Sequence, residues 1–184
     1  MGCLVTIKED TVSILVVMPL MQRAHTLQES AGLCFVNSTA SHDAQNLSVT
    51  FMLTTCATGA VPLAVVITEG QTQDDCTAGS SQLRNCDMPL FGGDGHPAVF
   101  MTDDSEAEQS NIHSVWPESR QTLCLFHVPQ ANWRWIWDSK NKVAKDDRPV
   151  LMLEFRSMML ASTLVVCLVL ICDMDRSQQP LRCS

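Results

Sequence analysis

Short apolar segments separated by turn-forming residues dominate the first half of the chain. Residues 31–36, 47–56 and 61–68 are rich in apolar and β-branched side chains, and polar or glycine-containing turns separate them. Such segments are typical of β-strands, and the short connections between the three predict an antiparallel meander. An earlier β-branched segment, residues 11–21, is interrupted by Pro19.

The second half alternates between strand-like and helix-like patterns. We expect a loop or weak helix at residues 69–87. Strands are expected at residues 98–102 and 121–126, and each is followed by a helix, at residues 103–114 and 128–139. Thr102 or Asp103 is the expected N-cap of the helix at residues 103–114. A charged linker then leads into a last apolar segment that starts at Val150. The pattern predicts one α/β domain.

The composition agrees with one domain but limits the partners that it can bind. The chain has 184 residues, of which 46% are hydrophobic, enough for a buried core. Its net charge is −8. Because a domain that grips DNA by itself usually carries a basic face, we expect weak DNA binding and leave protein partners open.

Secretion and membrane insertion are both disfavoured by the sequence. The nine cysteines are odd in number, and Cys34, Cys56 and Cys124 lie within apolar strand-like segments, where a free thiol behaves as a small hydrophobe. The N-terminus lacks the basic region of a signal peptide. Residues 158–172 form an uncharged apolar run of about 15 residues, shorter than the roughly 20 that span a bilayer. We expect a buried segment there and no membrane partner.

Several motifs follow one another in a distinctive order. F-V-N-S-T stands at residues 35–39, G-H-P-A-V-F-M-T-D-D at residues 95–104, W-P at residues 116–117 and L-C-L-F-H-V at residues 123–128. In this combination the chain resembles the Mutator-like-element (MULE) transposase domain, over about residues 14–160. The resemblance implies an RNase H-like mixed sheet, three antiparallel strands and then strand–helix–strand–helix, with a shortened C-terminus. It also implies an ancestry in DNA transposition and a nuclear location.

The same resemblance implies a catalytic centre built from carboxylates. In such domains acids on the first strand, at the end of the fourth strand and on a later helix hold two Mg²⁺ or Mn²⁺ ions roughly 4 Å apart. Asp103 takes the second place and is the expected metal ligand. Asn37 stands in the first place, and its amide offers one neutral oxygen without negative charge. Glu154 is a weak candidate for the third place, so we expect no metal to be retained.

Cys124 and His127 match the Cys-x-x-His that the family carries between its second and third acids. One interpretation is half of a tetrahedral zinc site, to be completed by a residue such as His113, His96 or Cys86. The other is a packed cysteine followed by a histidine at a strand–helix junction. In an active enzyme this histidine would approach the scissile DNA.

Three tryptophans alternate with other residues in the last predicted helix. Trp133 and Trp137 share one face, whereas Trp135 is turned away by about 160°. The aromatic and arginine side chains together could stack on bases, but packing of the shared face is the better interpretation. A neighbouring basic cluster is diluted by acids and is read as a solvated face; it comprises Arg134, Lys140, Lys142, Lys145 and Arg148.

These observations lead to a predicted organisation and three hypotheses. Residues 1–30 are an N-terminal extension, residues 31–160 the transposase-like domain, and residues 161–184 an apolar segment with an atypical tail. The first hypothesis is a degenerate or truncated transposase domain without strand-transfer activity. The second is a host-recruited domain that associates with DNA or proteins in transcription regulation. The third is a residual metal-dependent nuclease that uses Asp103.

Overall fold

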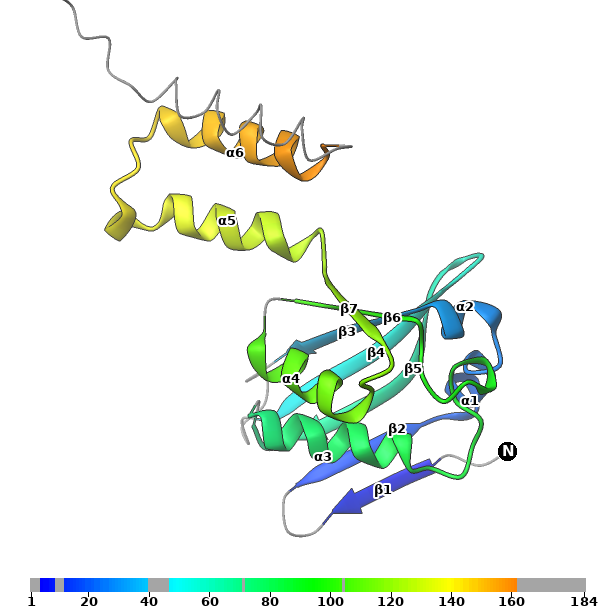
Figure 1. The fold of residues 1–184 in the computed structure, drawn as a ribbon. Helices are drawn as coiled ribbons and strands as arrows, with labels where there is room; N and C mark the ends of the chain where they lie inside the picture. The colour runs from blue at the N-terminus through cyan, green and yellow to red at the C-terminus, as the bar shows by residue number, and fades with distance from the viewer. Residues whose placement is uncertain (1–3, 9–11, 40–46, 71, 104, 162–184) are drawn as a thin grey trace, which may run out of the picture. The chain divides into compact units, whose positions relative to one another are not determined.

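The computed structural model describes residues 4–8, 12–39, 47–70, 72–103 and 105–161. The chain divides into two compact units (Figure 1), which we call the sheet unit, Met1–Cys124, and the helical unit, Leu125–Ser184. Most of the predicted tail, from residue 162 onward, lies outside the described residues. Each unit is treated by itself below.

The sheet unit is built on a seven-stranded mixed sheet in the order β1-β2-β5-β4-β3-β6-β7. Its strands are β1 Leu4–Lys8, β2 Ser13–Val17, β3 Leu33–Thr39, β4 Ser48–Cys56, β5 Gly59–Thr68, β6 Val99–Thr102 and β7 Arg120–Leu123. All neighbours from β1 to β3 pair antiparallel, whereas β3, β6 and β7 run parallel. The predicted meander of β3, β4 and β5 is therefore confirmed. β1 and β2 extend the same sheet beyond β5.

The helices of the sheet unit are α1 Pro19–Ala24, α2 Gln28–Gly32, α3 Gln73–Arg84 and α4 Glu106–Val115, with a 3-10 turn η1 at Phe91–Gly93. α3 falls where the sequence predicts a loop or weak helix, and it is a full helix of 12 residues. Its N-terminus is fixed by a capping box, because Thr72 accepts a hydrogen bond from the Asp75 N–H while the Asp75 carboxylate accepts one from the Thr72 N–H.

The core lies between the sheet and the neighbouring helices α3 and α4 (Figure 1). Leu15, Val36, Met52, Val66 and Phe100 come from five adjacent strands, and the helices add Leu83 and Ile112; all are at most 3% exposed. An aromatic group stiffens one end, where Trp116 meets the rings of Phe91 and Phe100 at centroid distances of 6.1 and 5.0 Å. The W-P motif thus supplies a core side chain.

The predicted N-cap of α4 is wrong by two or three residues. The helix begins at Glu106 and is capped by Ser105, whose hydroxyl accepts a hydrogen bond from the Glu108 N–H at 3.4 Å. Asp103 instead accepts a hydrogen bond from the Ser105 N–H at 3.0 Å. This Asx-type bond shapes the turn between β6 and α4, and Thr102 is buried as the last residue of β6.

The helical unit consists, in its described part, of α5 His127–Trp137, a 3-10 turn η2 Ser139–Asn141, and α6 Asp147–Met159. Trp133 and Trp137 stack at a centroid distance of 3.6 Å, and the Arg148 guanidinium lies 5.6 Å from the Trp137 ring. Trp135 is 57% exposed. The prediction that Trp133 and Trp137 share one face is confirmed, but the expected core packing of that face is not, because Trp133 is 47% exposed. None of the described helices is long and apolar enough to cross a membrane.

Candidate functional site

The candidate site lies at the carboxyl ends of two neighbouring parallel strands, β3 and β6. The last pair in their register is Phe35 with Met101, and Asn37 and Asp103 each stand two residues further along the chain. Carboxyl ends of parallel strands reach the same edge of a sheet, which is where α/β proteins commonly gather their functional side chains. Both residues therefore lie toward the same edge of the sheet, and the Asn37 side chain is exposed on the face of β3 opposite to Val36.

Glu108 is the residue that the sequence analysis missed at this edge. It lies in the first turn of α4, its side chain is 3% exposed, and its carboxyl contacts Asp103 and Ser38. One of its oxygens, Oε2, is buried without a hydrogen-bond partner among the described residues. A buried acid with an unpartnered oxygen is unusual in proteins, so Glu108 belongs to the candidate site.

The environment of Glu108 favours its neutral form. Burial raises the pKa of its carboxyl to about 7, and the negative charge of Asp103 and a hydrogen bond to Asp103 act in the same direction. The hydrogen bond with the Ser38 side chain opposes the rise in pKa. Below pH 7 Glu108 is therefore mostly in its neutral, protonated form.

Polar side chains from three further elements surround this pair. The hydroxyls of Ser38 and Thr50 lie 2.7 Å apart, across β3 and β4. Cys76 of α3 is close enough that the charge of Glu108 helps to raise the pKa of its thiol to about 11, after burial as the larger cause. Side chains alternate along a strand, so Ser38 shares the helix-covered face with Val36, whereas Asn37 is exposed on the opposite face.

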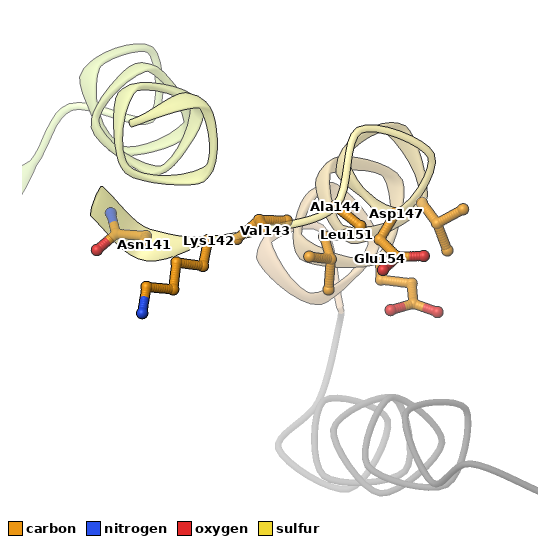
Figure 2. A pocket seen from close by; sticks show the side chains of 8 residues that line it. Asn141, Lys142, Val143, Ala144, Asp147, Leu151 and Glu154 are labelled. Atoms are coloured by element: carbon orange, nitrogen blue, oxygen red, sulfur yellow. The ribbon is translucent and has the colours of Figure 1, made fainter. Parts of the chain in front are cut away.

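The other predicted site residues are divided between the two units. Cys124 ends the sheet unit as a free cysteine, and its N–H donates to the Thr102 carbonyl at 2.7 Å. His127 opens α5 in the helical unit, where its ring meets Phe126 edge-on at 5.5 Å. Glu154 lies on α6 and lines an open pocket of about 510 Å³ with Asp147 and residues 141–144 (Figure 2).

The side chains at the sheet edge do not fit a two-metal centre. Such a centre needs several negatively charged oxygen ligands. Among the described residues, the edge offers the Asp103 carboxyl, the Glu108 carboxyl, whose pKa burial raises to about 7, and, on the opposite face of β3, the Asn37 amide. Among the described residues no three His, Cys, Asp or Glu side chains are grouped so that they could hold a metal ion.

A sequence signal for Glu108 exists once the start of α4 is known. Glu108, Asn111, Ile112 and Val115 are spaced i, i+3, i+4 and i+7, and all four are buried. A helix that begins at Glu106 therefore puts an acid on its core-facing stripe. The sequence pattern predicts a helix that starts at residue 103. With that start, the Ser105-x-x-Glu108 spacing does not indicate that Glu108 is buried.

The fold and site define a mixed α/β domain with an acidic pair, Asp103 and Glu108, where β6 leads into α4. The family description "MULE transposase domain" matches residues 39–146, more than half of the chain. The chain therefore belongs to the MULE transposase domain family. The matched region includes Asp103, Cys124 and His127, and it begins two residues after Asn37. No curated protein gives a significant match.

Proposed function

We propose that this chain is a transposase-derived domain of the RNase H-like type that no longer carries out strand transfer. Membership of the MULE family supports the transposase ancestry. The strand order β5-β4-β3-β6-β7, a meander followed by two parallel strands, agrees with the RNase H-like arrangement expected from the sequence. The observation that carries the proposed loss of activity is Asn37, near the end of β3, which stands in the place that the family resemblance gives to the first acid.

An amide in this place weakens a metal site for a simple electrostatic reason. Two divalent cations bring four positive charges to the centre, and ionised carboxylates offset them. Asn37 contributes no charge, and Glu108, whose pKa is raised to about 7, is only partly ionised at neutral pH. Of the residues that the structure describes at this edge, Asp103 alone would leave the positive charge insufficiently compensated, and the cations would remain in water.

A cleavage assay tests this proposal. Purified full-length protein is incubated with supercoiled plasmid and with labelled duplex ends, in Mn²⁺ and then in Mg²⁺. The wild type and Asp103→Asn should give the same background of nicked and joined products, and Asp94→Asn serves as an exposed acidic control. Mn²⁺-dependent products that Asp103→Asn abolishes and Asp94→Asn leaves intact would show a residual nuclease instead.

A second candidate function, a host-recruited interaction domain, is favoured by the surface of the helical unit. Phe126, Trp135 and Leu153 are 70%, 57% and 67% exposed there. Large exposed apolar side chains of this kind commonly mark contact surfaces. Affinity capture from nuclear extract with wild type and with Trp135→Ala/Leu153→Ala tests it, and equal recovery of every captured protein by both would count against this candidate.

A further inference from the structure

Both faces of the sheet carry apolar side chains. The helices α3 and α4 cover one face (Figure 1), and side chains on the other, which we call the open face, alternate with the buried positions along each strand. The register makes Ile67 a neighbour of both Ile14 and Val49, and it pairs Phe35 with Met101. The open face thus includes Ile14, Phe35, Val49, Phe51, Ile67 and Met101.

No helix in the described part of the sheet unit turns its buried apolar side chains to the open face. Those side chains, such as Leu83 of α3 and Ile112 of α4, form one cluster with the strand residues of the helix-covered face. On β4, Met52 is turned to the helices and is 1% exposed, whereas its neighbour Phe51 is 37% exposed. The open face is therefore an apolar surface without a second layer from this unit.

The sequences of the strands are typical of a sheet that is covered on both sides. An antiparallel sheet with one face in water alternates apolar and polar side chains, whereas strands buried on both faces are apolar throughout. Residues 14–17 of β2 and 63–67 of β5 are uninterrupted apolar runs. Water on the open face would leave these side chains unburied, so the pattern predicts a partner layer.

The area and the charge of the open face fit a second copy of the same sheet. Five strands about 4.8 Å apart, with about four rows of side chains, give a face of roughly 600 Å². Two copies would bury roughly 1,200 Å² in total, at the lower end of the range for specific interfaces. The strands β2 to β6 contain no charged residue, and Arg120 of β7 lies at the margin. Two such faces can therefore meet without burying a charge.

We infer that two copies of this chain associate sheet on sheet through the open face, as a symmetric dimer. In aligned packing of two sheets, the facing side chains interdigitate in a layer about 10 Å thick. A twofold axis brings the same patch of both copies into contact, with Phe51 on the central one of the five strands. The inference concerns association alone and does not rest on the proposed loss of strand transfer.

Sedimentation equilibrium of the full-length protein in reducing buffer tests the inference. We expect the wild type to be mainly dimeric at about 100 μM, and Phe51→Lys to raise the dimer Kd at least about tenfold because it places charge inside the interface. Leu123→Lys is the matched control, since Leu123 is 39% exposed and its register partner Thr102 faces the helices. This control should leave the Kd unchanged. Added salt should lower the Kd, because the chain carries a net charge of −8 and two copies repel each other.

Circular dichroism confirms that each variant is folded, and Phe51→Ser replaces Phe51→Lys if the lysine variant is not. A wild type that stays monomeric at about 100 μM would overturn the inference. So would a dimer that both Phe51 variants leave intact, or one that Trp135→Ala/Leu153→Ala in the helical unit abolishes. A benzophenone amino acid in place of Phe51 identifies what covers the face. Cross-links between two chains support the dimer, whereas cross-links confined to one chain would contradict it.

Discussion

The sheet unit and the helical unit differ in both burial and charge. The sheet unit contains nearly the whole core, whereas Ile136 is the single buried side chain in the described part of the helical unit. Residues 1–124 carry 14 acidic against 4 basic residues, a net charge of −10. Residues 125–184 carry 8 basic against 6 acidic residues, a net charge of +2. Stability therefore comes from one unit, and the surface that can attract an anionic partner belongs to the other.

The overall acidity of the chain therefore conceals two units of opposite net charge. The acidic sheet unit would repel the phosphate backbone near Asp103, where transposition chemistry would need DNA. The helical unit has exposed lysines and an exposed Trp135 but little core of its own. Helices of 11 and 13 residues are only marginally stable in isolation, so their order depends on tertiary contacts.

The largest expected difference in stability is between substitutions of one tryptophan in each unit. Trp116→Ala removes a fully buried ring from the aromatic group of the sheet unit and should cost about 3–5 kcal/mol in the free energy of unfolding. Trp135→Ala removes a ring that is 57% exposed and should change the same quantity by less than about 1 kcal/mol. Urea unfolding followed by circular dichroism measures both. Equal losses would contradict the division into a stable and a dependent unit.

The next effect concerns pH and Glu108. Its pKa is about 7 in the folded protein against an ordinary value of 4.5, so between these values the folded state holds more protons than the unfolded state. The free energy of unfolding should fall by about 3 kcal/mol as the pH rises through this window. Glu108→Gln should remove most of that slope, whereas Glu106→Gln should preserve it. Chemical unfolding at a series of pH values distinguishes them.

His25 should give the opposite pH dependence, because its contribution to the free energy of unfolding is lost as the pH falls. It is fully buried, and burial lowers its pKa from 6.5 to about 4; its Nδ1 accepts a hydrogen bond from the Phe91 N–H at 3.3 Å. Below pH 6.5 the unfolded state takes up a proton that the folded state refuses until about pH 4, so the stability contributed by the neutral ring is lost across that interval. His25→Asn retains an acceptor and should flatten this part of the stability profile, even though it lowers stability overall. An unchanged acid limb in the variant would refute the assignment.

The smallest effect belongs to the surface of the sheet unit. Arg84 and Glu118 form a bidentate ion pair with distances of 2.9 and 3.2 Å, and both side chains are more than a third exposed. Exposed pairs contribute about 0–1 kcal/mol, and salt screens them. Arg84→Met should therefore lower the urea midpoint only slightly, and high salt should erase the difference from the wild type. A large loss that persists in high salt would mean that the pair supports the packing of α3.

The sequence predicts some parts of this molecule well because the governing forces are local. β-branched segments and tight turns specify the β3–β4–β5 meander, and helical periodicity places Trp133 and Trp137 on one face. The position of Asp103 directly after a strand is also read from neighbouring residues. The assignment of Asn37 to the first acid's place remains a prediction from the family resemblance.

Other parts depend on tertiary contacts that the sequence pattern does not display. The polar segment before Arg84 becomes a helix because its few apolar residues, such as Leu83, pack against the sheet and its capping box fixes the start. The cap of α4 falls at Ser105 because Asp103 is engaged in the preceding turn. This shift in the start of the helix, small in sequence, decides that Glu108 faces the core and meets Asp103.

The most direct measurement for the central claim is a calorimetric titration of the wild-type protein with Mn²⁺ at neutral pH, repeated with Asp103→Asn. If the sheet edge lacks the charge that a metal centre needs, both proteins give the same weak response, with a Kd in the range of about 1 mM or above. A micromolar Kd in the wild type that Asp103→Asn abolishes would contradict the account and assign a working metal site to this transposase-derived domain.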